Sequence, residues 1–152
     1  GLMDVVGREL RTRLGMLAVS LSWFNLPLTD EHGADVNARF SQHEQRFGVH
    51  AGQVETAMML ALKPELVHMD RAASFPSATE QRAQDCPLFG DGRSAKLAWH
   101  MGDLNAQGAA GDAAAATAAD GEAVVQAAGR ALAQLLGEIA AYPVPGEVGD
   151  RR

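Results

Sequence analysis

The chain has 152 residues and a single cysteine, Cys86, which excludes an internal disulfide and a zinc site built from cysteines. It is also short of positive charge, with 13 Lys and Arg against 19 Asp and Glu. Nucleic-acid binding needs clustered Lys and Arg, so we expect no nucleic-acid partner. No apolar run reaches the roughly 18 uncharged residues of a membrane helix, and no basic segment leads into an apolar core at the start. We therefore expect a cytoplasmic protein without a membrane span or a secretory signal.

The composition is that of an ordinary folded protein, because 47% of the residues are hydrophobic and 21% are charged. A chain of this length suits one domain, which we expect to cover residues 1–142. The remaining residues, 143–152, follow Tyr142 and predict a flexible tail.

Apolar residues recur at helical spacing in three parts of the chain, at residues 2–14, at residues 52–62 and from Thr117 to Ile139. Gly15 is the expected C-cap of the first helix, and Pro64 ends the second. The last helix begins with Thr117 and Asp120, which resemble a capping box.

Apolar and small residues alternate from Met16 to Trp23, which predicts a buried strand. Residues 70–112 are rich in Ser, Pro, Gly, Asp and Gln, so we expect irregular structure there with one short strand at residues 97–99. Helices alternating with few strands predict an α/β fold that holds part of a parallel sheet.

The segment from His50 to Thr56 carries the densest set of reactive groups. An imidazole precedes an expected helix start, Gly52 allows close backbone approach, and Glu55 falls in the first turn. One interpretation is structural, with Glu55 complementing the helix dipole and His50 an ordinary loop residue. The other makes His50 a proton shuttle and Glu55 its orienting carboxylate or an outer ligand of a metal.

The string HAGQVETAMMLALKPELV, His50 to Val67, resembles the HAGExETSxMLALxPxLV signature of the creatininase (creatinine amidohydrolase) family. Ser22-Trp23 looks like the end of a family strand. Gly108 to Thr117, followed by Asp120-Gly121, is similar to the family's glycine-rich element before the last helix. The resemblance spans roughly residues 3 to 140.

The resemblance implies an α/β sandwich around a mainly parallel sheet, apparently incomplete at the N-terminus here, and a homo-oligomer, in the family a hexamer. It also implies a metal-dependent hydrolase that cleaves a C–N amide bond in a small, cyclic or open amide. The divalent metal would be zinc, manganese or iron. His50 matches the histidine that relays a proton to the leaving nitrogen, and Glu55 matches its acidic partner. Trp23, Gly52 and Gln53 match substrate-binding positions near the pocket.

The departures from the family pattern concern the metal and the substrate. Gln53 replaces a glutamate, and Arg46 and Phe47 replace the residues that bind creatinine, which argues against creatinine as substrate. The family's metal ligands have no counterpart, so we expect the chain to be the C-terminal part of a longer family member.

The acidic and histidine residues outside the motif are interpreted as solvated loop residues; they are Asp30, Glu31, His32, His43 and Glu44. A glutamate in the loop of His43 and Glu44 could alternatively reach the pocket. The alternative to an enzyme is a catalytically silent fragment or assembly module. In either case a sheet without its first strands exposes edges, which predicts self-association.

Overall fold

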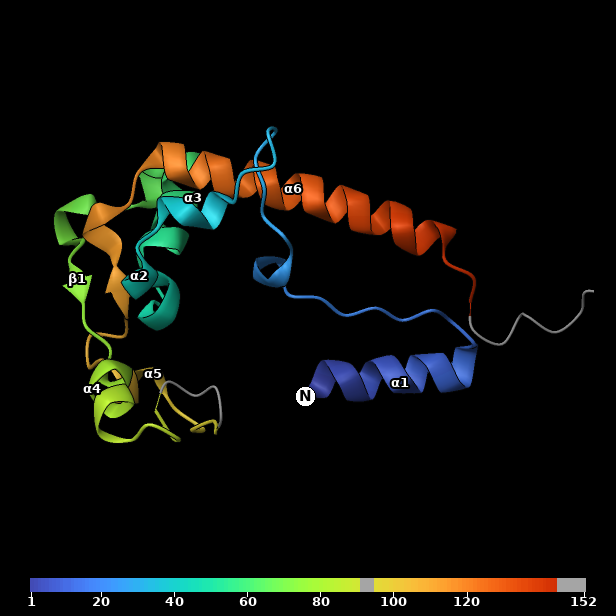
Figure 1. Ribbon diagram of the computed structural model, residues 1–152, viewed down its shortest axis with the longest axis horizontal. Coiled ribbons are helices and arrows are strands. Elements are labelled where there is room, and N and C mark those ends of the chain that lie inside the picture. The colour runs from blue at the N-terminus through green and yellow to red at the C-terminus, as the bar shows by residue number, and fades with distance from the viewer. Residues whose placement is uncertain (91–94, 145–152) are drawn as a thin grey trace, which may run out of the picture. The chain divides into compact units, whose positions relative to one another are not determined.

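The computed structural model describes residues 1–90 and 95–144 of the chain (Figure 1). The chain divides into two compact units, of which the second is Leu28–Ala127. The first consists of Gly1–Pro27 and the chain from Ala128 onward.

The predicted domain limits are not tested by this division. A single domain over residues 1–142 stays a prediction, and most of the predicted tail, residues 145–152, lies outside the described residues.

The first unit begins with helix α1, Leu2–Leu14, which confirms the predicted helix. Gly15 ends it in the left-handed conformation, at φ 66°, as expected of a glycine C-cap. The strand predicted at Met16 to Trp23 is wrong, because residues 16–22 form no regular structure and Trp23–Asn25 is a 3₁₀ turn. Alternation favours a strand only where a neighbouring strand binds its backbone groups, and no strand among the described residues pairs with this segment.

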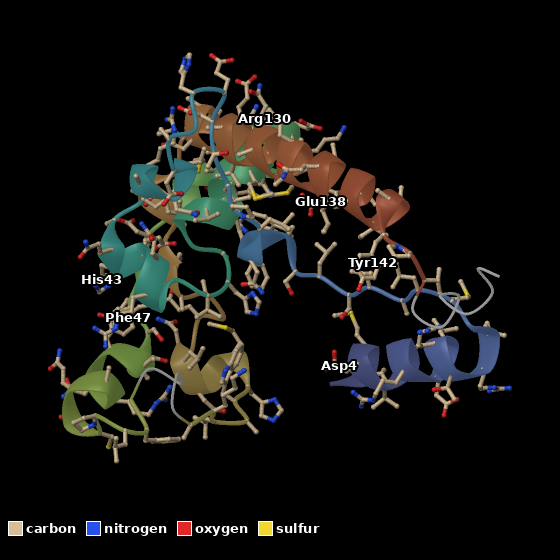
Figure 2. The ribbon with its side chains drawn as sticks, turned by 45° about the vertical axis from the view of Figure 1, so that its right-hand side comes forward. Asp4, His43, Phe47, Arg130, Glu138 and Tyr142 are labelled. Atoms are coloured by element: carbon tan, nitrogen blue, oxygen red, sulfur yellow. The ribbon has the colours of Figure 1, made fainter. Side chains whose placement is uncertain are left out.

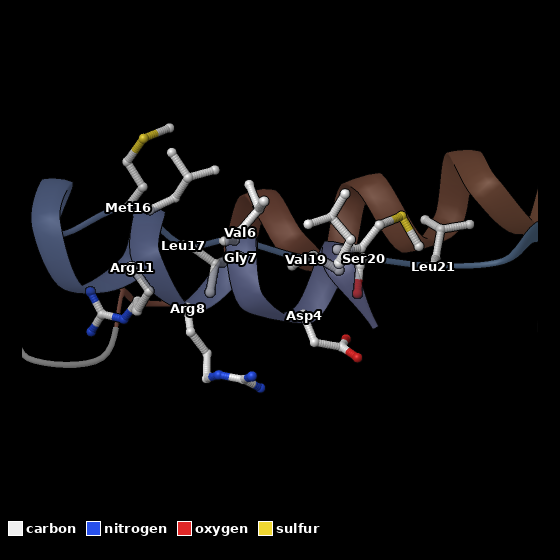
Figure 3. A pocket seen from close by; sticks show the side chains of 14 residues that line it. Asp4, Val6, Gly7, Arg8, Arg11, Met16, Leu17, Val19, Ser20 and Leu21 are labelled. Carbon is white, nitrogen blue, oxygen red and sulfur yellow. The ribbon is translucent and has the colours of Figure 1, made fainter.

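An open groove of about 900 Å³ lies between α1 and residues 16–21. Figure 3 shows Asp4 and Arg8 on the side of α1 opposite to Val6 and Met16. None of residues 1–27 is buried, and Leu2, Val5 and Leu14 are among the exposed apolar side chains of this unit.

The second unit holds short helices and a two-stranded sheet. Its α-helices and strands are α2 (Gln42–Phe47), α3 (Gln53–Leu62), β1 (Ser74–Phe75), α4 (Ala78–Asp85), α5 (Met101–Leu104), β2 (Gly111–Asp112) and the first part of α6 (Ala118–Ala141). Its 3₁₀ turns are Val36–Arg39, Pro64–Leu66, Met69–Arg71 and Ala113–Ala115.

Strands β1 and β2 are antiparallel, with Ser74 opposite Asp112 and Phe75 opposite Gly111. The described residues therefore do not form the mainly parallel sheet that we expected. The strand predicted at residues 97–99 is also wrong, since that segment is irregular. Helices α4 and α5 lie within the stretch predicted to be irregular.

The core of the second unit is built mostly from small side chains. Its buried apolar residues are Leu28, Val36, Phe40, Ala57, Leu104, Ala109, Ala110, Ala113, Ala116, Val124 and Ala127. Small side chains let helices approach closely, and α3 lies against the start of α6 (Figure 1). At Gly121 in α6 a β-carbon would overlap the backbone of Ala57 in α3. Glycine at position 121 is therefore required by the distance between the two helices.

Helix α6 begins as its capping residues predict. The Asp120 backbone N–H donates to Thr117 Oγ1 at 3.2 Å, and Thr117 Oγ1 donates to Asp120 Oδ2 at 2.6 Å. Arg39 Nη1 donates to Asp120 Oδ1 at 2.8 Å. The hydroxyl of Thr117 and then the guanidinium of Arg39 lower the pKa of Asp120 from its ordinary value of 3.8, against a smaller opposing effect of desolvation.

Replacing Thr117 with alanine is expected to lower the free energy of unfolding by about 1 kcal/mol at neutral pH, the usual cost of a lost N-cap. A lowered carboxyl pKa stabilises the folded state above the ordinary value of 3.8, and this contribution disappears as pH falls through the lowered pKa. The difference between wild type and Thr117→Ala should therefore narrow below about pH 4. Urea unfolding at pH 7 and pH 3 measures both values. An equal difference at the two pH values would show that Asp120 does not contribute through this bond.

Candidate functional site

His50 lies in an extended segment between α2 and α3. Its carbonyl accepts from Ala110 N at 2.8 Å, and Val49 N donates to the Ala110 carbonyl at 2.8 Å. This isolated antiparallel bridge fixes the backbone of His50 against the segment that leads into β2. The side chain of His50 is 54% exposed, so the imidazole is fixed at its base and open to solvent.

Glu55, in the first turn of α3, lies beside His50. Glu55 Oε1 is 3.7 Å from His50 Nδ1, and Glu55 Oε2 accepts from Ala51 N at 2.8 Å. A carboxylate that faces Nδ1 favours the tautomer with a proton there, which leaves Nε2 to accept or donate a proton. At 3.7 Å the two atoms are near neighbours but lie beyond hydrogen-bond distance. The two side chains predicted to act together are thus neighbours on one surface.

Trp99 is a third member of this surface that the sequence did not single out as a site residue. Its ring centroid is 6.0 Å from that of His50, at an interplanar angle of 62°. Trp99 is 40% exposed, so part of the indole remains available beside the imidazole. The sequence around Trp99 holds no motif that would mark it as a site residue. Trp99 lies 49 positions after His50, so only the fold brings the two rings together.

Three residues were predicted to contact substrate. Gly52 is buried, and a β-carbon there would overlap Glu44 Oε1, so packing alone requires glycine at this position. The Gln53 side chain donates from Nε2 to the Ala115 carbonyl at 3.1 Å. Trp23 belongs to the first unit, where its ring packs edge-on against Phe24 at 5.9 Å. Substrate contact at each of these residues stays a prediction.

The prediction that Glu44 is a solvated loop residue is wrong, because Glu44 lies on α2 and is 4% exposed. His43 also lies on α2, so its loop assignment is wrong as well, but its side chain is exposed as expected. Its ring is 5.2 Å from that of Phe47 on the same helix (Figure 2). For Glu31 and His32 the prediction is confirmed, since both side chains are about four-fifths exposed, at 79% and 81%.

A divalent metal site needs several His, Cys, Asp or Glu side chains close together. No group of three or more His, Cys, Asp or Glu side chains in residues 1–90 and 95–144 is arranged to hold an ion. His50 with Glu55 and His43 with Glu80 supply two donors each. A catalytic zinc site takes three protein ligands and a water, so these pairs do not fit one by themselves.

No helix among the described residues has the length and apolar character needed to cross a membrane.

The solved structures that match this chain include creatininase variants and a provisionally assigned creatinine amidohydrolase. A provisionally assigned creatinine amidohydrolase from Bacteroides fragilis superposes with a TM-score of 0.68 at 23% identity, covering 93% of this chain and 51% of that one. A zinc-containing creatininase variant superposes with a TM-score of 0.55 at 22% identity, covering 94% and 50%. A creatininase variant complexed with creatine gives 0.54 at 23% identity, covering 90% and 49%. The chain thus spans about half the length of these structures. No curated protein matches it.

The chain belongs to the creatininase family. The family model described as creatinine amidohydrolase matches residues 1–136, which include the whole second unit and part of the first. The family resemblance of the motif that begins at His50 is thereby confirmed.

Proposed function

We propose that this chain forms part of a metal-dependent amidohydrolase that cleaves a C–N bond in a small, cyclic or open amide. His50 acts as the proton relay and Glu55 as the carboxylate that orients it. The observation that carries the proposal is the 3.7 Å approach of Glu55 Oε1 to His50 Nδ1 on an accessible surface. Membership of a family described as creatinine amidohydrolase supports the reaction class.

The chemistry that the two side chains supply is proton transfer. Breaking a C–N amide bond requires a proton on the departing nitrogen, while the attacking water must lose one. An imidazole whose Nδ1 proton faces Glu55 presents Nε2 to the attacking water and to the departing nitrogen in turn. Glu55 stabilises the imidazolium that exists between the two transfers. His50 thus returns to its neutral form at the end of each cycle.

The family resemblance implies a bound divalent metal and an α/β sandwich around a mainly parallel sheet. We include both in this proposal. Since the described residues do not supply three ligands, we place the ligands of the zinc, manganese or iron ion outside them. The substrate class, the homo-oligomer and the cytoplasmic location are proposed on the same resemblance.

A second function, that of a catalytically silent assembly module, is favoured by one observation. The first unit exposes apolar side chains of α1, among them Leu2 at 80%, and has no buried residue in its described part. Such a surface is typical of a segment that other chains or segments cover. A hydrolysis assay of the wild-type protein distinguishes the two functions.

Glu55→Gln tests the proposal in the protein that carries this chain, assayed with cyclic amides and formamides. The carboxamide can still accept from Ala51 N, but its NH₂ would face His50 Nδ1 and favour the wrong tautomer. We expect kcat to fall about 10- to 100-fold, as for other residues that orient a reactive group. Glu65→Gln is the matched control, because Glu65 is an exposed glutamate paired with Lys63 at 3.8 Å. Equal activity of wild type and Glu55→Gln would contradict the role of Glu55, and an inactive wild type would favour the silent module.

A further inference from the structure

Glu44 is the one charged residue that is buried in the described part of the chain. Both of its carboxylate oxygens accept backbone hydrogen bonds. Oε1 accepts from Gln53 N at 2.6 Å, and Oε2 accepts from Asp112 N at 2.8 Å. Gln53 is the first residue of α3, where the free N–H groups and the helix dipole favour a negative charge. The Glu44 side chain therefore links α2 to the start of α3 and to β2.

Three glycines make the space that this carboxylate occupies. A β-carbon at Gly48, Gly52 or Gly111 would in each case meet Glu44 Oε1 closer than real atoms approach. These glycines come from the end of α2, the N-cap of α3 and strand β2. Segments from separate parts of the sequence are thus shaped around a single side chain.

The segment that carries His50 needs such support because of Ala51. Ala51 has φ 50°, and it is the one residue other than glycine with a positive φ in the described residues. This conformation is unfavourable for alanine and persists only where the surroundings hold it. The holding bonds are those of Glu55 to Ala51 N and of Glu44 to Gln53 N, on the two sides of Gly52.

We propose that Glu44 is a positioning residue for the His50–Glu55 pair, an inference that rests on the proposed function. Glu44 touches neither His50 nor Glu55 through a hydrogen bond in the described structure. It acts by holding the first turn of α3, from which Glu55 reaches back to Ala51. It also holds β2, which directly follows the segment that pairs with His50. When Glu44 no longer accepts both N–H groups, His50 and Glu55 are still present, but the 3.7 Å arrangement of their side chains is lost.

Glu44→Gln tests this inference in the protein that carries this chain. The carboxamide keeps the volume of the side chain but turns an NH₂ toward one of the two backbone N–H groups, which then lacks an acceptor. We expect hydrogen exchange at Ala51 N to become about tenfold faster and kcat to fall about tenfold. A change of this size is the effect of one lost buried hydrogen bond. KM should stay within about twofold, because an orienting residue acts on the reacting geometry and not on ground-state binding.

Glu80→Gln is the matched control. Glu80 Oε1 also accepts one backbone N–H, from Ser77 at 2.9 Å, but at the start of α4. The carboxamide oxygen introduced by Glu80→Gln can still accept from Ser77 N, so this variant removes a carboxylate at a helix start without removing a backbone bond. We expect kcat and the exchange at Ala51 to stay unchanged. Gly48→Ala is the second test variant, because its added methyl would displace the Glu44 carboxylate without changing its chemistry. The methyl would also meet the Glu44 carbonyl oxygen at 2.7 Å, so the end of α2 must shift as well. This variant is expected to reproduce the effects of Glu44→Gln, and it decides the question if Glu44→Gln does not fold.

Folded variants at Glu44 and Gly48 that keep both wild-type kcat and wild-type exchange at Ala51 would overturn the inference. So would a fall in kcat of the same size in Glu80→Gln. If the wild-type protein hydrolyses no amide, the proposed function fails. Exchange at Ala51 then decides alone whether Glu44 positions this segment, since it requires no substrate.

Discussion

Hydrolysis by the protein that carries this chain is expected to fall about 10²- to 10⁴-fold when His50 is replaced by alanine, the usual contribution of a general acid–base residue. In the proposed function the imidazole is the group that moves the proton, and Glu55 Oε1 lies 3.7 Å from its Nδ1. Alanine removes the relay and leaves Glu55 bound to Ala51 N, so the backbone should be preserved. Steady-state kinetics with the best amide substrate measure the loss.

His32→Ala is the control for this experiment. His32 lies 3.4 Å from Glu31, so it is also a histidine beside a glutamate, but in an exposed loop. It should retain wild-type activity. Imidazole added to the buffer should restore part of the activity of His50→Ala, since the free base can occupy the space left by the side chain. Full activity in His50→Ala would eliminate the relay, and a loss of folding together with activity would assign His50 a structural role.

Gly121→Ala is expected to destabilise the fold by about 3 kcal/mol or more, at the upper end for overpacking. Its β-carbon would overlap the carbonyl oxygen and carbon of Ala57 and come within 2.7 Å of Met58 N. All of these are backbone atoms of α3, so no side-chain rotation relieves the overlap. The start of α6 must move away from α3, which would open the alanine-rich core around Val124.

The control lies in the same helix. At Gly129 a β-carbon would meet nothing within 4 Å, and alanine favours helix more than glycine does. Gly129→Ala should therefore leave the protein unchanged or stabilise it by up to about 1 kcal/mol. Thermal unfolding followed by circular dichroism compares the two variants. Equal stability of both would mean that α3 and α6 are not packed as the structure has them.

The helices that the sequence predicts correctly are those with a sustained apolar period. Helices α1, α3 and α6 meet this condition, and their ends follow from Gly15, Pro64 and Thr117. Helix α4 has no apolar stripe, so periodicity could not reveal it. Its sequence does contain a signal, because Ser77 and Glu80 form a capping box in the structure. The strand predicted after α1 fails because pairing is a property of two segments, and alternation describes only one.

In the candidate site too, the residues with a local sequence signal were identified and those that depend on the fold were not. His50 and Glu55 were identifiable because they are close in sequence at the start of a helix. Glu44 was misread because the short helix α2 has no sustained apolar period to mark it. A local signal for this helix exists, since Ser41 and Glu44 have the spacing of a capping box and Ser41 Oγ accepts from Glu44 N at 3.0 Å. The Glu44 side chain, however, binds Gln53 and Asp112, nine and 68 positions further along the chain. Bonds across such separations depend on the fold and have no local signal.

The predominance of alanine in the interior of the second unit also affects the thermodynamics of its folding. An alanine side chain has no rotamers to lose, so ordering the alanines of this interior costs backbone entropy alone. Each methyl group in turn removes little apolar surface from water, and the heat capacity change of unfolding scales with that surface. The second unit should accordingly unfold with a smaller heat capacity change per residue than a domain whose interior is filled with leucine and phenylalanine.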